Sequence, residues 1–310
     1  MPAALLRKRA REISRWNQLV LICIGRDSWE AELAEKIDAH HHLWRYTAAE
    51  YGWIDDAMSG LRRDFLPEDL TRVMTAAGVN GAVAVQARQT LEETRWLLDI
   101  ADQCDRIRGV VGWAPIADSG FARVLGEFAG RSKLKGLRHI IQAEADENYI
   151  LREDFSTGVR ELKGSGLVYD ILIYERHLPQ TIEFVDKHLN QVFVLDHVAK
   201  PRIREGVMEP WATKMLELAR RQNVWCKVSG MVTEADWRDW TLETLRPYLD
   251  VVVESFGPRR LMVGSDWPVC LVACGYEQWF DVLHEYFAGF SEAERDSVFG
   301  LTATEVYGLR

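Results

Sequence analysis

Short apolar runs that alternate with helical stretches constrain the fold of this chain most strongly. Several of these runs, such as the one from Ala82 to Val85, are apolar throughout rather than at every second residue. Continuous apolarity is typical of parallel strands that are covered on both faces. The eight predicted strands cover residues 36–40, 79–86, 109–114, 134–138, 168–172, 191–195, 224–228 and 260–263. Eight strands, each followed by a helical stretch, predict a (β/α)8 TIM-like barrel.

The barrel is predicted to occupy residues 36–310 as one domain, because no repeat or Pro/Gly/Ser-rich linker divides this part of the chain. A doubly wound open sheet is the structural alternative, but no glycine-rich phosphate loop follows the first strand. Residues 1–35 form a predicted N-terminal extension, either packed on the barrel or disordered. Its apolar run, residues 19–24, is too short to span a bilayer, and no small-residue cleavage site follows it.

Charge and cysteine content limit the class of partner. The formal charge of −9 argues against nucleic acid and against an anionic membrane, since both require a concentrated basic face. The five cysteines include no C-x-x-C pair, which favours reduced thiols in a cytoplasmic protein. These observations favour a small-molecule substrate and leave the oligomeric state open.

Two histidines at the end of the first predicted strand are candidate metal ligands. His40 and His42 are separated by one residue, so on a strand their side chains point to the same side while that of His41 points away. Paired imidazoles at the carboxyl end of a barrel strand supply half of a typical metal site. Taken alone, the motif is a weak signal, because packed histidines at a strand end more often give the same pattern.

Two further strands end in polar residues of the same kind. The sixth predicted strand runs into Asp196 and His197, and the eighth runs into Asp266. Each could cap the following segment instead. A barrel brings the carboxyl ends of all its strands to one face, however, where the active sites of this fold lie. His40, His42, His197 and Asp266 are therefore predicted to converge as ligands of a divalent metal, zinc in preference to manganese.

These motifs resemble the amidohydrolase-related superfamily (amidohydrolase 2), and more narrowly its sugar lactonases such as L-fuconolactonase and L-rhamnonolactonase. The resemblance extends from Ile37 to the C-terminus. It rests on residues 37–44 with 51–54, 85–87 with Glu92 and Glu93, 111–113, 135–139, 195–201, 227–230 and 264–269. The chain departs from the group at His41, where glutamine is frequent, and in the extension before Lys36.

The resemblance implies hydrolysis of a sugar aldonolactone to the open-chain acid in deoxysugar catabolism. It also implies that His40, His42, His197 and Asp266 match the metal-site positions of the family, although the metal is dispensable in some related lactonases. The chemistry assigns Asp266 as general base, and Asp266 or His197 as the group that returns a proton to the leaving alkoxide.

Polar and aromatic residues around these motifs are candidates for binding the substrate. The polar candidates lie at predicted strand ends, where they suit an oxyanion or sugar hydroxyls, and the tryptophans could stack on the sugar ring. The predicted substrate-binding residues are Arg138, His139, Lys200, Trp44, Trp53 and Trp267.

Two other functions are compatible with the same barrel. Metal-dependent decarboxylases or hydratases of the superfamily, acting on small carboxylic acids, use a similar ligand set. Lys-Pro after the Asp196 motif and Trp-Pro after Asp266 favour the lactonases over them. A non-catalytic sugar-binding barrel is the third alternative, but it would be expected to have lost a ligand position, and none is lost here.

Overall fold

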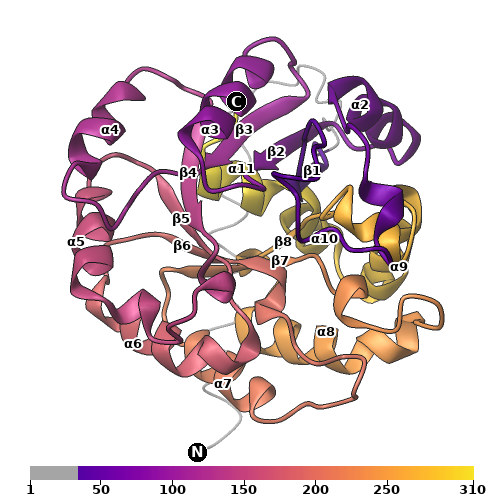
Figure 1. Cartoon of the computed structure of the whole chain (residues 1–310). Helices are drawn as coiled ribbons and strands as arrows, with labels where there is room; N and C mark the ends of the chain where they lie inside the picture. The colour runs from indigo at the N-terminus through magenta and orange to yellow at the C-terminus, as the bar shows by residue number, and fades with distance from the viewer. Residues whose placement is uncertain (1–33) are drawn as a thin grey trace, which may run out of the picture. The chain divides into compact units, whose positions relative to one another are not determined.

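Eight parallel strands form the centre of the described part of the chain, residues 34–310 of the computed structural model (Figure 1). They are β1 (Ile37–His41), β2 (Gly81–Val85), β3 (Ile107–Gly112), β4 (Leu134–His139), β5 (Val168–Ile171), β6 (Phe193–Leu195), β7 (Val224–Val228) and β8 (Leu261–Val263). The strands pair in chain order. All eight predicted strands are confirmed, and no bound differs by more than two residues. The predicted extension lies, except for its last two residues, outside the described residues.

Contacts between β1 and β8 close the sheet into a barrel. His41 and Trp267 form a parallel bridge. The amide of Asp266 donates to the carbonyl of His40 at 2.8 Å, and the amide of His42 donates to the carbonyl of Trp267 at 2.6 Å. The predicted (β/α)8 fold is thus confirmed. The same backbone segments that close it carry three of the four predicted metal ligands.

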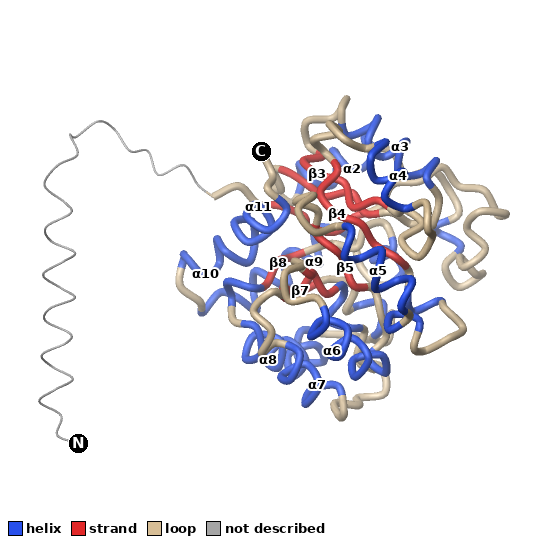
Figure 2. Tube along the Cα trace, turned by 90° about the vertical axis from the view of Figure 1, so that its left-hand side faces the viewer, coloured by secondary structure: helices blue, strands red, loops and turns tan. Residues whose placement is uncertain are grey.

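Helices follow the strands and cover the outside of the barrel (Figures 1 and 2). They are α2 (Pro67–Ala76), α3 (Leu91–Ala101), α4 (Phe121–Glu127), α5 (Glu153–Glu161), α6 (Leu178–Lys187), α7 (Trp211–Leu218), α8 (Leu242–Phe256), α9 (Tyr276–Tyr286), α10 (Glu292–Asp296) and α11 (Thr302–Tyr307). Local sequence sets their ends. Thr90, for example, caps α3 by accepting a hydrogen bond from the amide of Glu93. Leu97 and Leu98 then bury the inner face of α3 against the sheet.

The strands separate two apolar layers. On β2, Ala82 and Ala84 face the helices, while Val83 and Val85 face the barrel interior, as the alternation of a strand requires. The interior layer consists of Ile37, Ala39, Val83, Val85, Val111, Val168, Val194, Met262, Ala303, Tyr307 and Leu309. The last three of these come from α11 and the residue that follows Gly308.

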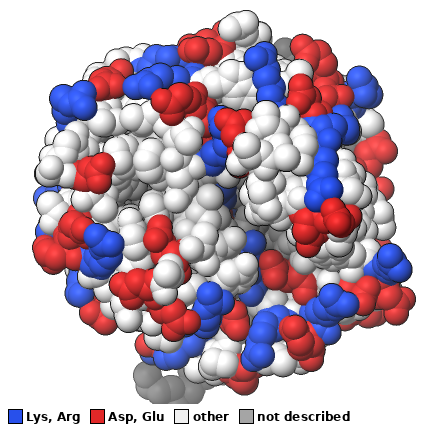
Figure 3. Space-filling model, in the orientation of Figure 1, with Lys and Arg blue, Asp and Glu red and all other residues white. Residues whose placement is uncertain are grey.

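Helix α11 closes the amino-terminal end of the barrel. Leu309 packs against Gly109 at the start of β3, and Lys135 at the start of β4 donates to the carbonyl of Gly308 at 2.8 Å. In the view of Figure 1, α11 lies behind the strands. Figures 1 and 3 therefore show the opposite, carboxyl-end face, which α11 leaves open.

The described residues also bear on two sequence predictions, the absence of a membrane span and the state of the cysteines. None of the helices between residues 34 and 310 combines the length and apolarity needed to cross a membrane. Cys104, Cys226, Cys270 and Cys274 are free thiols, as the sequence predicts. Cys23 lies outside the described part of the chain.

Candidate active site and metal centre

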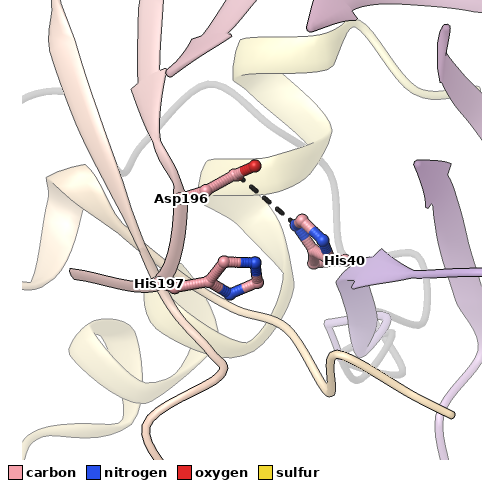
Figure 4. Close-up of side chains that lie close together, drawn as sticks. All are labelled: His40, Asp196 and His197. Atoms are coloured by element: carbon pink, nitrogen blue, oxygen red, sulfur yellow. Dashed lines mark ion pairs between the residues drawn. The ribbon is translucent and has the colours of Figure 1, made fainter. Parts of the chain in front are cut away.

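The four predicted metal ligands meet at the carboxyl end of the barrel. Oδ1 of Asp266 lies 3.3 Å from Nε2 of His42, 3.8 Å from Nε2 of His40 and 3.9 Å from Nε2 of His197. The rings of His40 and His197 lie next to one another, with centroids 4.4 Å apart and ring planes inclined by 59° (Figure 4). All four side chains are buried. Three imidazole nitrogens and one carboxylate oxygen therefore point at a common volume.

The far nitrogens of two of these rings are fixed by neighbours. Nδ1 of His42 donates to the carbonyl of Val85 at 2.7 Å, which leaves its Nε2 with a lone pair facing Asp266. Nδ1 of His197 is hydrogen-bonded to the hydroxyl of Ser229 at 2.9 Å. Metal-binding histidines are usually oriented through their second nitrogen in this way. The outer contacts thus present both Nε2 atoms to the centre.

Unusual backbone conformations place two of the predicted ligands. Residues 197–200 all have positive φ, between 48° and 61°, although none is glycine. Asp266 has φ 55°. A left-handed conformation costs about 1–2 kcal/mol per non-glycine residue, and such strain is concentrated at functional sites. Gly230, with φ +60°, makes the turn at His197 possible, because a Cβ there would lie 2.5 Å from Nδ1 of His197.

Asp196 holds a group of buried charges beside His40. Its carboxylate accepts a hydrogen bond from Nη1 of Arg138 at 2.8 Å and forms an ion pair with Nζ of Lys227 at 3.0 Å, and it lies 3.4 Å from Nδ1 of His40 (Figure 4). Burial alone would raise the pKa of Asp196, but Lys227 and His40 together hold it well below the ordinary value. Asp196 is therefore ionised throughout the neutral range.

The same network continues toward the amino end of the barrel. Nζ of Lys227 also donates to Oδ2 of Asp170 at 2.5 Å and lies 3.2 Å from Nδ1 of His40. The hydroxyl of Tyr307 in α11 donates to Asp170 at 2.9 Å. Burial raises the pKa of Asp170 to about 6, against the opposing charge of Lys227. A buried chain of contacts thus links α11 to His40.

Asp38 on β1 ties the strand to the turn that carries Asp266. Its carboxylate accepts from the amide of Ser265 at 2.8 Å, the hydroxyl of Ser265 at 2.6 Å and the hydroxyl of Tyr276 at 3.0 Å. Burial raises the pKa of Asp38 to about 6, while its hydrogen bonds with Ser265 act in the opposite direction. Asp38 therefore positions the strained residue Asp266 without facing the centre itself.

The donor set and the charge of the site both fit a divalent ion. Nitrogen and carboxylate donors in this number are typical of zinc, and they also suit manganese. The buried charged side chains around the imidazoles are Asp38, Asp170, Asp196, Asp266, Arg138 and Lys227. When all six are ionised, their net charge is −2, which a divalent cation would balance, and buried charge is costly unless it is balanced. His40, His42, His197 and Asp266 are the residues that would hold the ion.

Asp266 is suited to accept a proton. Burial alone would raise its pKa, but the neighbouring His197 and His42 outweigh that effect and hold the pKa below its ordinary value. Burial lowers the pKa of His197 to about 4. Near neutral pH the pair is thus a carboxylate beside a neutral imidazole, which is the arrangement that a general base requires.

The polar substrate-binding candidates take different positions. Arg138 contributes Nη1 at 3.4 Å from Nε2 of His40, but it is also bound to Asp196 and to the carbonyl of Gln86. Nε2 of His139 donates to Glu144 at 2.6 Å, and Nδ1 accepts from Nε1 of Trp113 at 3.3 Å. Both nitrogens of His139 are thus used within the protein, which favours a role in positioning the loop after β4.

The tryptophan candidates also differ in exposure. The rings of Trp44 and Trp267 are 0% and 2% exposed and both pack against Phe65, so protein already covers their faces. Trp53 is 44% exposed and rests edge-on against Trp44, with centroids 6.0 Å apart. Among the three, only Trp53 presents a ring for stacking in this structure.

Reasoning from the sequence missed several contributors. Asp170 and Lys227 received no role, although each is a charged residue within an otherwise apolar strand, and such a residue must find a buried partner. For Asp196 the sequence predicts only a capping role. Asp38 and Ser229 have no signal of their own, because their roles depend on which loops the barrel brings together.

The comparisons with known proteins identify the family of this chain. The model of the amidohydrolase family matches residues 37–309, and the chain belongs to that family. It is 40% identical to an L-fucono-1,5-lactonase from Burkholderia multivorans over 287 residues, covering 89% of this chain and 97% of that protein. An L-fucono-1,5-lactonase from Burkholderia ambifaria is 34% identical, with 88% and 96% covered. A zinc-bound crystal structure of an amidohydrolase from Burkholderia multivorans superimposes with a TM-score of 0.87 at 40% identity, covering 89% of this chain and all of that one.

Proposed function

We propose that this protein hydrolyses a sugar 1,5-lactone to the open-chain aldonic acid, with L-fucono-1,5-lactone as the first substrate to test. The observation that carries the proposal is the convergence of three imidazole nitrogens on the Asp266 carboxylate. The L-fucono-1,5-lactonases at 40% and 34% identity, which the chain matches over nearly their whole length, support the choice of substrate. Such a reaction belongs to the catabolism of deoxysugars.

Hydrolysis of a lactone requires a nucleophilic water, a stabilised oxyanion and a proton for the leaving alkoxide. A divalent ion, zinc in the first place, would supply Lewis-acid polarisation of the carbonyl when bound. Asp266 accepts a proton from the attacking water, since it is ionised and has His42 and His197 to hold it in place. Protonated Asp266, or His197, then returns the proton to the ring oxygen as the C–O bond breaks.

The buried charges hold the reacting groups still. Arg138, Lys227 and Asp196 surround His40 and fix its ring plane. Arg138 also brings a cation close to the position where negative charge develops on the carbonyl oxygen. Trp53 and Lys200, on the loops after β1 and β6, are the proposed contacts to the sugar ring. Trp44, Trp267 and His139 would act mainly by supporting them.

The free thiols among the described residues favour a reducing compartment, and we infer a cytoplasmic enzyme.

The test is a pH-indicator assay of the purified full-length protein against L-fucono-1,5-lactone, with the uncatalysed rate subtracted and bound metal measured in parallel. We expect hydrolysis together with about one equivalent of a divalent ion. If sugar lactones are not hydrolysed above the uncatalysed rate by the metal-loaded protein, the proposed function is wrong. If hydrolysis is complete in protein without bound metal, the metal assignment alone is wrong.

A further inference from the structure

We propose that Glu234 and Lys200 together form a subsite that binds hydroxyl groups of the lactone ring, with Glu234 as the residue that determines specificity. This inference rests on the proposed function and assigns a role to Glu234, which lies outside the metal-binding and proton-transfer groups. Glu234 ends the short helix Val232–Glu234 in the loop after β7, and Lys200 ends the left-handed turn after β6. Both loops lie at the carboxyl end of the barrel.

The left-handed turn places Lys200 beside the catalytic centre. The amide of Lys200 donates to the carbonyl of His197 at 2.7 Å, closing a tight four-residue turn. This bond holds the backbone of Lys200 next to that of the predicted ligand His197. The charge of Lys200 accordingly influences the pKa values of both His197 and Asp266. The strained turn at residues 197–200 thus carries both the imidazole of His197 and the ammonium group of Lys200.

Glu234 pairs with Lys200 from the neighbouring loop. Its Oε1 lies 3.5 Å from Nζ of Lys200, and the two side chains are 23% and 16% exposed. Burial raises the pKa of Glu234, Lys200 opposes this, and the charge of Asp266 adds to the rise. Glu234 therefore lies within electrostatic reach of Asp266 while remaining accessible from the open face. Figure 3 shows that face hollowed near its middle, with charged atoms of both signs inside the hollow.

The ion pair keeps most of its hydrogen-bonding capacity free. An ammonium has three donors and a carboxylate about four acceptor sites, and the separation of 3.5 Å exceeds that of a good hydrogen bond. Among residues 34–310, the Glu234 carboxylate has no close partner besides Lys200. A hydroxyl group both donates and accepts, so two vicinal hydroxyls match a carboxylate beside an ammonium. The lactone carbonyl only accepts hydrogen bonds, so we place it near His40, His42, His197 and Asp266 and not at this pair.

The experiment compares two substrates that share the six-membered lactone ring, L-fucono-1,5-lactone with its hydroxyl groups and δ-valerolactone without them. Glu234→Gln keeps the shape of the side chain and removes its charge. A hydrogen bond to a charged group corresponds to a loss of about 10- to 100-fold in kcat/KM when it is broken. We expect this loss on L-fucono-1,5-lactone, mainly through KM, and a loss at least tenfold smaller on δ-valerolactone. Lys200→Met should show the same selectivity.

Asp236→Asn is the matched control. Asp236 lies two residues further along the same loop, is exposed, and pairs with exposed Arg204 at 3.9 Å. This variant should keep wild-type constants on both substrates. Equal losses on both substrates in Glu234→Gln would overturn the proposed subsite and leave the proposed function intact. An inactive wild-type protein would instead refute the proposed function, and this subsite with it. Circular dichroism of each variant verifies that the fold is retained.

Discussion

Replacing Lys227 with methionine would remove a buried ammonium group and retain a side chain of similar length. Nζ of Lys227 lies 2.5 Å from Asp170, 3.0 Å from Asp196 and 3.2 Å from His40, and the side chain is fully buried. In the variant, two buried carboxylates would share the interior without the cation between them. Arg138 would remain as the partner of Asp196.

The expected loss of stability can be bounded from this geometry. A pair of unit charges at 4 Å interacts by about 4 kcal/mol at an effective dielectric constant of 20, and Lys227 lies closer than that to two carboxylates. The cost of burying Lys227 itself, which the variant no longer incurs, offsets much of this. Removal of one partner from a buried ion pair typically costs about 3–5 kcal/mol, and we expect a loss of unfolding free energy in this range at pH 8.

The loss should depend on pH with a definite sign. The pKa of Asp170 is about 6 in the folded protein, above the ordinary 3.8, so the folded state binds more protons than the unfolded state between these values. Stability contributed by this group is therefore lost as pH rises through that window. Without Lys227 the folded pKa rises further. The difference between wild type and variant should accordingly be larger at pH 8 than at pH 5.

Urea unfolding of both proteins at pH 5 and pH 8, followed by circular dichroism and fluorescence, measures these differences. Lys187→Met is the matched control, because Lys187 forms an exposed pair with Glu183 at 2.7 Å. An exposed pair contributes about 0–1 kcal/mol. If Lys227→Met loses no more than this control at either pH, Lys227 does not compensate the buried carboxylates, and the charge balance described above is refuted.

Three further predictions concern the metal, the proton-transfer group and the buried carboxylate of Glu93 in α3. The double variant His40→Ala, His42→Ala should lose most of the bound divalent ion in elemental analysis; full metal retention would place the ion elsewhere. Asp266→Asn should lower kcat by about 100-fold or more with the fold intact, and near-normal turnover would move the general base to another group. Burial raises the pKa of Glu93 to about 7, so its ionisation should lower stability as pH rises from 4.5 to 7, by about 3 kcal/mol in total. Glu93→Gln should flatten that part of the stability profile in urea unfolding, and an unchanged slope would contradict the shift.

The sequence predicted the strands and the four central residues because both depend on local patterns. Continuous apolar runs identify strands, and a polar residue directly after such a run is brought to the site by the barrel itself. His40 and His197 are more than 150 residues apart in the chain, yet the fold class alone predicts their proximity.

What could not be predicted depends on side-chain packing between distant segments. The residues next to Trp44 and Trp53 in sequence do not reveal that the ring of Trp44 is covered by Phe65 while that of Trp53 is exposed. In the same way, the sequence around Tyr307 does not indicate that its hydroxyl group lies inside the barrel and is hydrogen-bonded to Asp170. The left-handed turn at residues 197–200 is also invisible in a sequence without glycine there.

The closure of the barrel between β1 and β8 has a thermodynamic consequence. The amide of Ser265 is bonded to Asp38 across 227 residues of chain, and the proposed ligand-binding groups lie on both sides of this seam. A molecule that binds only the closed state adds RT ln(1 + [L]/Kd) to its stability, about 2.7 kcal/mol at a hundredfold excess over Kd. Any ion or lactone bound by both His40 and Asp266 would therefore stabilise the contact between the first and last strands. On binding, the hydrogen exchange of the backbone amides between β1 and β8 should slow at lower ligand concentrations than the exchange of amides in the other strands. The melting temperature should rise with the fraction of protein that is bound, so it reports binding without a measurement of catalysis.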